Sequence, residues 1–302
     1  MVIERNIKYR IIFEFSTKHS VCVMCRFLSV SRSTYYSWLK RRGMEDKDVP
    51  LIEAIRTGQN INKNTYGYRR MTLWLNNFIG IHVNNKRVRR VMKKAGLQAE
   101  IRKKKKFKVM SGNIHGYENI LNREFRSDRP NQKLVTDITY IRTKKGNIFL
   151  SMIKDLFDNS IQGYQISRNN NIKLVTDTLK KAFENNNKVV ADGPILHSDQ
   201  GFQYTSHAYF NLTQRYGLKV SMSRKGNSLD NACAENFFSH IKSELVNRVK
   251  WENYEEAKDA IDEYIRYYNN DRIQIKLKKA PMQYRAYEIN SVNIGIAKKG
   301  LL

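Results

Sequence analysis

Residues 133–167, KLVTDITYIRTKKGNIFLSMIKDLFDNSIQGYQIS, decide the fold class of the chain. They contain three runs rich in β-branched and aromatic residues, at 133–143, 147–156 and 161–167. The segments KKGN and FDNS between these runs are rich in turn-forming residues. The pattern therefore predicts three strands joined by short turns.

Helices and strands are predicted to alternate after these three strands. Apolar residues recur at helical spacing in 171–186, and the short apolar run PILHSD (194–199) is typical of a buried strand. A helix near 206–217, a strand at 218–223 and a long helix from Asp230 follow. This order predicts an α/β domain, with a mixed sheet and helices on its faces.

The C-terminal residues predict a further amphipathic helix and then a basic tail. The helix begins in YEEAKDAIDEYIRYYNN (254–270), where apolar residues again recur at helical spacing. We expect Pro281 to end regular structure in the tail, because proline cannot continue a helix that reaches it.

Basic residues dominate the composition, above all in the first third of the chain. The 302 residues include 55 Lys and Arg against 28 Asp and Glu, a formal net charge of +27. Residues 1–110 hold 26 of the basic and 7 of the acidic residues. Such a field attracts polyanions, and nucleic acid is the commonest polyanionic partner of a soluble protein. A basic protein of a membrane surface or of the ribosome would fit the charge as well.

The cysteines point to a reduced, intracellular protein. Cys22, Cys25 and Cys233 are too few for a disulfide framework. His19 lies three residues before Cys22, but no fourth ligand at suitable spacing accompanies them, so a structural zinc site is disfavoured. No apolar run approaches the roughly 20 residues that span a bilayer, and the N-terminus lacks the apolar core of a signal peptide. We expect no membrane association.

Residues 18–42, KHSVCVMCRFLSVSRSTYYSWLKRR, predict two short helices around the turn SVS. The pattern is typical of a helix-turn-helix unit, in which the start of the second helix meets base edges. Arg32, Ser33 and Tyr36 lie at that position and are candidate DNA contacts. A plain helical hairpin is the alternative interpretation.

A second basic helical unit is predicted at 50–98. It contains TYGYRRMTLWLN (65–76) and HVNNKRVRRVMKKAGL (82–97), where Gly96 is expected to close the last helix. Six basic residues in nine positions surround the apolar face of that helix, which favours phosphate contact over a solvated surface. The candidate DNA contacts here are Arg69, Arg70, Arg87 and Arg90, followed by Lys103, Lys104 and Lys105 in a segment without sustained period.

Three carboxylates are candidates for chemistry. Asp137 lies within a predicted strand, Asp199 ends a short apolar strand, and Glu235 borders the buried face of a helix. Each has an ordinary alternative: an outward position on an edge strand, a cap for the helix near Ser206, or a surface stripe with Lys242. Together at one sheet edge they would form a site for two divalent cations, since Mg²⁺ prefers carboxylate oxygens. Two such ions can support an in-line phosphoryl displacement.

Three sequence blocks resemble the second-frame (OrfB) transposases of insertion sequence family three: NQKLVTDITY, LHSDQGFQYTS and MSRKGNSLDNACAENFFSHIKSE. These proteins belong to the DDE, retroviral-integrase-like group with a ribonuclease H-like core. Asp199 and Glu235 are separated by 35 residues, the spacing characteristic of that group. YIRYYNNDRIQIKL, APMQYR, TYGYRR and NNKRVRRVMKKAGL match further blocks of the family. The chain departs from it at Leu134, where the family has Trp, and at Ala280, where Ser is common.

The resemblance implies roles for individual residues. Asp137, Asp199 and Glu235 correspond to the catalytic ligands of two Mg²⁺ ions, for which Mn²⁺ can substitute, and Lys242 to a residue that helps hold the end of the element. The implied activity is cleavage at the element ends and strand transfer by the freed 3′-hydroxyl, through a circular intermediate. The implied partners are double-stranded DNA (terminal inverted repeats and target DNA), further copies of the chain, and the upstream-frame protein, in a prokaryotic cytoplasm near the nucleoid.

Five regions follow from these patterns. We expect a helix-turn-helix-like unit, a second basic helical unit, a basic linker, a ribonuclease H-like catalytic core, and a C-terminal helix with a basic tail, at 1–44, 50–98, 99–129, 130–248 and 249–302. Two rival functions remain open: a DNA-binding regulator with an inactive core, and a nuclease of the same fold. The presence of all three carboxylates argues against the inactive core.

Overall fold

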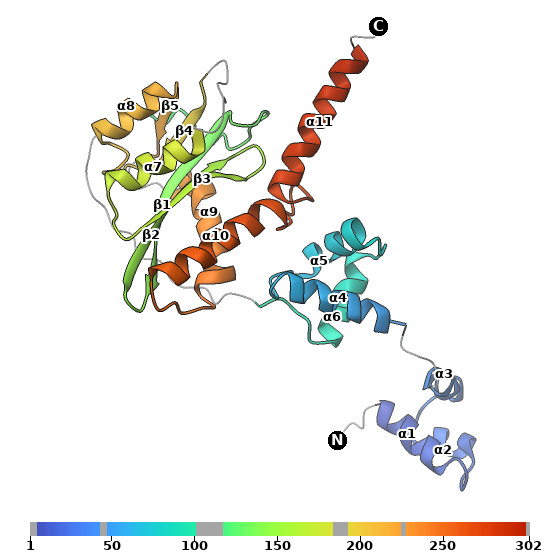
Figure 1. Cartoon of the computed structure of the whole chain (residues 1–302). Helices are drawn as coiled ribbons and strands as arrows, with labels where there is room; N and C mark the ends of the chain where they lie inside the picture. Colours follow the sequence, from blue (N-terminus) through green and yellow to red (C-terminus); the bar gives the residue numbers. More distant parts are fainter. Residues whose placement is uncertain (1–4, 43–46, 101–116, 184–192, 225–227, 300–302) are drawn as a thin grey trace.

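A computed structural model describes residues 5–42, 47–100, 117–183, 193–224 and 228–299, with side chains as far as residue 291 apart from Ser228. Its centre is a five-stranded mixed sheet (Figure 1). The strand order is β3-β2-β1-β4-β5, with bounds Lys133–Thr143 for β1, Gly146–Asp155 for β2, Ile161–Ser167 for β3, Ile195–Ser198 for β4 and Lys219–Met222 for β5. The first three strands are antiparallel, and β4 and β5 run parallel to β1. The predicted mixed sheet of a ribonuclease H-like core is confirmed.

Helices cover both faces of this sheet. On one face, α7 (Ile172–Phe183) and α8 (His207–Arg215) bury an apolar cluster with Leu134 and Ile153. On the other face, α9 (Ala232–Ile241) and α10 (Tyr254–Asn270) pack over Val135 and Met152. The alternation along β1 and β2 explains this division, because neighbouring residues of a strand point to opposite faces. Leu134 is fully buried, as expected for the hydrophobic position beside the first strand.

The register of β1 creates an open edge at the centre of the sheet. Only Lys133, Leu134 and Val135 of β1 pair with β4. From Thr136 onward β1 pairs with β2 alone. Asp137 therefore lies just beyond the point where the parallel neighbour ends, which is where ligand sites of such sheets form.

The N-terminal unit is a three-helix cluster of α1 (Arg5–Phe15), α2 (Val21–Phe27) and α3 (Arg32–Arg42). The predicted pair α2–α3 is confirmed. Helix α1 was not expected from the sequence pattern, and its Tyr9 and Ile12 complete a core with Cys25 and Tyr35.

The second helical unit contains α4 (Val49–Ile61), α5 (Tyr68–Trp74), the π-helical turn η1 (Leu75–Ile79) and α6 (Asn85–Lys94). Gly96 has φ +68°, and the next N–H, of Leu97, donates to the carbonyl of Met92 at 2.9 Å. This is the αL closure of a helix that the sequence predicts at Gly96. Ile273, far along the chain, lies in the apolar core of this unit.

Part of the expected linker 99–129 packs against the core. Leu121 is 1% exposed within the cluster under α9 and α10, and its N–H donates to Ser221 Oγ at 3.0 Å. Tyr117 stacks on Phe210, with ring centroids 6.1 Å apart. Residues 117–125 thus depart from the linker prediction. Their short irregular path has no period that a sequence pattern could show.

Pro281 begins a helix, which corrects the prediction that it ends regular structure. Helix α11 runs over Pro281–Lys299. Proline is favoured at the first helical position because that residue needs no N–H donor. One turn later, Arg285 forms buried ion pairs with Asp155, the last residue of β2, and with Asp158, so the first turn of the helix packs against the core. None of the helices in the described ranges is long and apolar enough to cross a membrane.

Candidate active site

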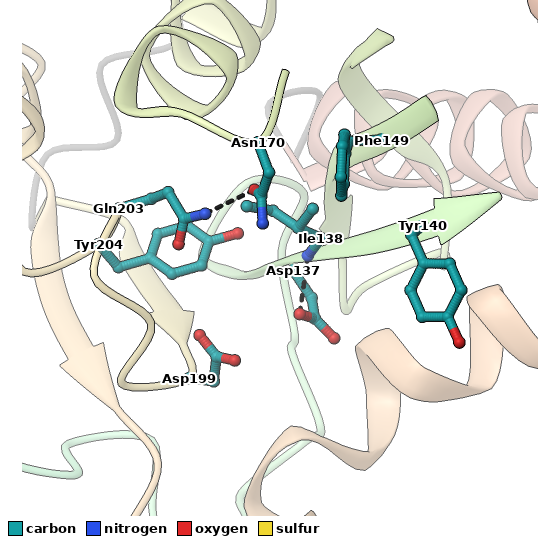
Figure 2. Close-up of a pocket in the computed structure, with 8 residues that line it drawn as sticks. All are labelled: Asp137, Ile138, Tyr140, Phe149, Asn170, Asp199, Gln203 and Tyr204. Atoms are coloured by element: carbon teal, nitrogen blue, oxygen red, sulfur yellow. Dashed lines mark hydrogen bonds between the residues drawn. The ribbon is translucent and has the colours of Figure 1, made fainter. Parts of the chain in front are cut away.

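Asp137 and Asp199 meet at one pocket at the open edge of β1 (Figure 2). Asp137 comes from the middle of β1 and Asp199 directly follows β4. The two strands are adjacent and parallel, so the sheet order brings the two carboxylates together. The pocket has a volume of about 190 Å³ and is lined by Asp137, Ile138, Tyr140, Phe149, Asn170, Asp199, Gln203 and Tyr204.

Short local hydrogen bonds orient the two carboxylates. Asp137 Oδ1 accepts the backbone N–H of Ile138 at 2.7 Å, and Asp199 Oδ1 accepts that of Gly201 at 2.9 Å. A Cβ atom at Gly201 would lie 2.9 Å from Asp199 Oδ1, so glycine allows this close approach. The remaining carboxylate oxygens are left for a ligand or solvent.

Burial and like charge make the pocket a poor place for uncompensated carboxylates. Burial first, and then the charge of Asp199, raise the pKa of Asp137 to about 8. Burial also raises the pKa of Asp199. A hard divalent cation would favour the ionised forms of both groups and would use the oxygen ligands that it prefers. The donor set therefore fits a cation of the Mg²⁺ class.

Glu235 lies in the first turn of α9, which packs against β1. Its charge contributes to the raised pKa of Asp137, but Glu235 is exposed and does not line the pocket. Within the described part of the chain, no three His, Cys, Asp or Glu side chains are close enough together to hold a metal ion. The structure thus brings two of the three candidate ligands together and leaves Glu235 nearby. His19, Cys22 and Cys25 likewise form no group of three that could hold a metal ion in the described residues, and both cysteines are free thiols.

Lys242, seven residues after Glu235, is the first residue of the π-helical turn η3 (Lys242–Val246) that continues α9. Its ammonium lies 5.5 Å from the ring centroid of Tyr140, which lines the pocket. The candidate DNA-holding lysine is therefore at the pocket rim.

Two buried polar residues, Asp230 and Lys154, hold the start of α9, and neither was predicted as a functional residue from the sequence. Asp230 Oδ2 accepts the backbone N–H and Nε of Arg224 at 3.0 and 2.9 Å, and Arg123 Nε donates to Oδ1 at 2.7 Å. The hydrogen bonds from Arg224 hold the pKa of Asp230 well below its usual value. Lys154 Nζ donates to the carbonyl of Cys233 at 3.1 Å, and burial lowers the pKa of this lysine to about 8. The sequence signal for Lys154 was a charged residue inside the apolar run IFLSMIKDL.

Most candidate DNA contacts are exposed. Arg32, Ser33 and Tyr36 lie at the start of α3 with exposed side chains. Arg69 is exposed beside Tyr68 on α5. Arg87 and Arg90 are exposed on α6, and both pair with Asp48, at 3.1 and 2.9 Å. Lys103, Lys104 and Lys105 lie outside the described residues.

Arg70 differs from the other candidates. Its side chain is 18% exposed, and its Nη1 lies 3.5 Å from Glu244 of η3. Sequence alone could not separate it from Arg69, because the two are adjacent on a seven-residue helix. The structure directs Arg70 toward the core and Arg69 toward solvent.

Comparisons with known proteins identify the family of the chain. Two models described as integrase core domain match residues 127–228 and 235–289, and one described as HTH-like domain matches 45–105. The putative transposase InsK for insertion sequence element IS150 of Escherichia coli (strain K12) is 40% identical over 264 residues, which cover 87% of this chain and 92% of that protein. The chain belongs to the transposases of insertion sequence family three.

Other members of the transposase family are similarly close. The transposase for insertion sequence element IS904 of Lactococcus lactis subsp. lactis (strain IL1403) is 37% identical over 240 residues, covering 78% of this transposase and 94% of that one. Among solved structures, the HTLV-2 integrase catalytic core domain in complex with magnesium (trimeric form) aligns with a TM-score of 0.43 and 17% identity. That alignment covers 53% of this chain and 99% of the integrase domain.

Proposed function

We propose that this transposase cuts DNA at the ends of the insertion sequence that encodes it and joins the freed 3′-hydroxyl to a new phosphate. The observation that carries the proposal is the pair of carboxylates, Asp137 and Asp199, at the pocket on the open edge of β1. In strand transfer one P–O bond forms as another breaks, so the number of phosphodiester bonds is unchanged. The attacking hydroxyl gives its proton to water, and the displaced 3′-oxygen takes up a proton from water, so no nucleotide cofactor is required. In the preceding cut, water supplies the attacking oxygen, and the products are a 3′-hydroxyl and a 5′-phosphate.

Asp137 and Asp199 are the proposed ligands of Mg²⁺, two ions per site with Mn²⁺ as a substitute, and Glu235 completes the set when α9 moves toward the pocket. When bound, the two cations would activate the attacking oxygen and stabilise the leaving oxygen. Asp137 and Asp199 would supply the carboxylate oxygens that hold these cations in the pocket. Lys242, whose Nζ lies 5.5 Å from the Tyr140 ring centroid, would hold a phosphate of the element end at the rim of the pocket.

The helical units are the proposed DNA-binding surfaces. Arg32, Ser33 and Tyr36 would meet base edges, and Arg69, Arg87 and Arg90 would hold phosphates. Lys103, Lys104 and Lys105 would add phosphate contacts. We place the reaction in a prokaryotic cytoplasm at the nucleoid, with several copies of the chain on terminal repeats and target DNA. The upstream-frame protein would act with this chain as a fusion or as a separate partner.

One assay tests the proposal. The full chain is incubated with Mg²⁺ and duplexes copied from the sequences that flank its coding region, and products are resolved as cut or joined strands. Joined ends are expected from the wild type. We expect Asp137→Asn and Glu235→Gln to bind the DNA without cutting it. Glu255→Gln, which changes an exposed glutamate of α10 paired with Arg168, serves as the matched control and should join ends normally.

The other outcomes of this assay would favour a rival function or remove a residue from the proposed site. Binding without cleavage by the wild type would favour a regulator with an inactive core, and cleavage without joining would favour a nuclease. Normal joining by Glu235→Gln would remove Glu235 from the metal site.

A further inference from the structure

Tyr140 is an exposed aromatic residue at the wall of the catalytic pocket. It lies three residues after Asp137 on β1 and is 58% exposed. Phe149 is its cross-strand partner on β2 and lines the same pocket (Figure 2). Neither ring is part of the apolar clusters found among the described residues. Core packing therefore does not account for Tyr140.

The surroundings of Tyr140 combine a flat apolar face with charge on two sides. Lys242 Nζ lies 5.5 Å from its ring centroid, and Asp137 and Asp199 lie in the same pocket. On this part of β1 the edge opposite β2 has no strand partner, since pairing with β4 ends at Val135. A polymer strand can therefore approach the ring and the carboxylates from one side.

These features match a nucleotide: an aromatic face for the base, an ammonium for the phosphate, and carboxylates that hold cations at the next phosphate. At a frayed or single-stranded DNA end the base next to the reacting phosphate has lost a stacking partner, so an aromatic face beside the pocket can take it up. Aromatic side chains replace the lost base stacking without regard to sequence, because every base has a π-face.

We propose that Tyr140, with Phe149 beside it, is a nucleobase subsite that stacks an unpaired base next to the reacting phosphate, while Lys242 binds the adjacent phosphate. The proposal rests on the proposed function, because it presumes that a DNA end enters this pocket. It assigns Tyr140 to positioning the DNA end and gives it no part in the bond changes themselves.

The test is a double-mutant cycle between the protein and the DNA. The probes are duplexes copied from the element end with a short single-stranded tail that carries either a base or an abasic sugar at its terminal nucleotide. Removal of the base leaves the phosphates in place, so it isolates stacking. Affinity is measured by fluorescence anisotropy before Mg²⁺ is added.

We expect the abasic probe to bind the wild type about five- to a hundredfold more weakly than the base-containing probe. Tyr140→Ala should weaken binding of the base-containing probe by a similar factor and bind both probes equally. Tyr140→Phe keeps the ring and should retain the discrimination. A tail with 2-aminopurine at the same position should lose fluorescence on binding the wild type and keep it on Tyr140→Ala.

Tyr287 provides a matched control. It is 56% exposed on α11, and Lys279 Nζ lies 5.0 Å from its ring centroid, so it reproduces the cation–π pair away from the pocket. Tyr287→Ala should leave probe discrimination unchanged. Thermal melting of Tyr140→Ala checks folding, and Tyr140→Phe decides the matter if the alanine variant unfolds.

Two results would overturn the subsite: equal affinity of the wild type for both probes, or full discrimination by Tyr140→Ala. If the wild type joins DNA ends while either result holds, only the subsite fails. If the wild type neither binds nor joins end DNA, the proposed function itself fails.

Discussion

Glu244 accepts two hydrogen bonds from Arg272, from Nε at 2.8 Å and from Nη2 at 2.6 Å. Arg272 follows α10 and is 1% exposed, while Glu244 lies in η3 and is 9% exposed. Arg70 of the second helical unit completes the cluster at 3.5 Å from Glu244. The cluster therefore joins three parts of the chain: the helix that carries Glu235, the segment after α10, and a helix of the second basic unit.

Arg272→Ala should reduce the free energy of unfolding by about 3–5 kcal/mol, because it leaves the carboxylate of Glu244 buried without its main partner. Urea unfolding of the full chain followed by circular dichroism measures the change. The control is Lys63→Ala, which removes an exposed pair with Glu263 and should cost less than about 1 kcal/mol. Equal effects of the two substitutions would contradict a special role for the buried pair.

The same pair predicts a pH dependence of stability. Burial alone would raise the pKa of Glu244, but the hydrogen bonds and charge of Arg272, with the charge of Arg70, hold it below its usual value. The unfolded chain therefore takes up the proton first. The stabilisation is complete above the unfolded pKa of about 4.3 and is lost as the pH falls toward the folded pKa. Glu244→Gln should flatten the acid side of a plot of unfolding free energy against pH; an unchanged slope would exclude this linkage.

Gly163→Ala should destabilise the core by about 1–3 kcal/mol, the usual cost of overpacking. A Cβ at Gly163 would lie 2.7 Å from Cβ and 2.8 Å from the backbone nitrogen of Ala182 on α7. Backbone atoms cannot rotate away, so α7 must shift from β3. Gly67→Ala is the control, since a Cβ there meets nothing within 4 Å. Thermal melts of the two variants compare them directly, and a normal melting temperature for Gly163→Ala would show that the helix moves freely.

Mg²⁺ should raise the melting temperature of the wild type, because a ligand that binds only the folded state stabilises it by about 2.7 kcal/mol at 100 times its dissociation constant. Asp137→Asn and Asp199→Asn should abolish this shift, and EDTA should reverse it in the wild type. Without Mg²⁺ the Asp137→Asn variant should melt no lower than the wild type, since it removes like charge from the pocket. A Mg²⁺ shift that survives in both variants would locate the cation elsewhere.

Arg69 and Arg70 should differ in DNA binding although they are neighbours. Arg69 is exposed, so Arg69→Ala should weaken binding to DNA and reduce the slope of log affinity against log salt by about 1. Arg70 pairs with Glu244 in the interior, so Arg70→Ala should lower the melting temperature and keep the slope. Anisotropy titrations at several salt concentrations measure both slopes. The same loss of slope in both variants would place Arg70 on the DNA.

The sheet and its flanking helices were predictable from sequence because their signal is local. The alternation around Asp137 and the apolar run before Asp199 each identify a strand without reference to the rest of the chain. The three sequence blocks that resemble second-frame transposases added a further signal, the 35-residue separation of Asp199 and Glu235. These signals named the family, the fold and the candidate carboxylates.

The features that the sequence did not reveal depend on partners far along the chain. Leu121 is one apolar residue in an irregular segment, and only the cluster under α9 explains its burial. Pro281 can end or begin a helix, and the difference is set by Arg285 and its buried partners Asp155 and Asp158. The inward direction of Arg70 depends in the same way on Glu244.

Helix α9 and η3 form one continuous helix with a carboxylate near each end, and the two carboxylates face different parts of the protein. Glu235 stands in its first turn beside the pocket, and Glu244, nine residues later, is held by Arg272 and Arg70. Nine residues of helix span roughly 13 Å. A tilt of the second helical unit on binding DNA would move the Glu244 end of this helix and so change the distance of Glu235 from Asp137. With Glu235 in its proposed role, DNA binding and completion of the proposed metal ligands would then be coupled through this one helix.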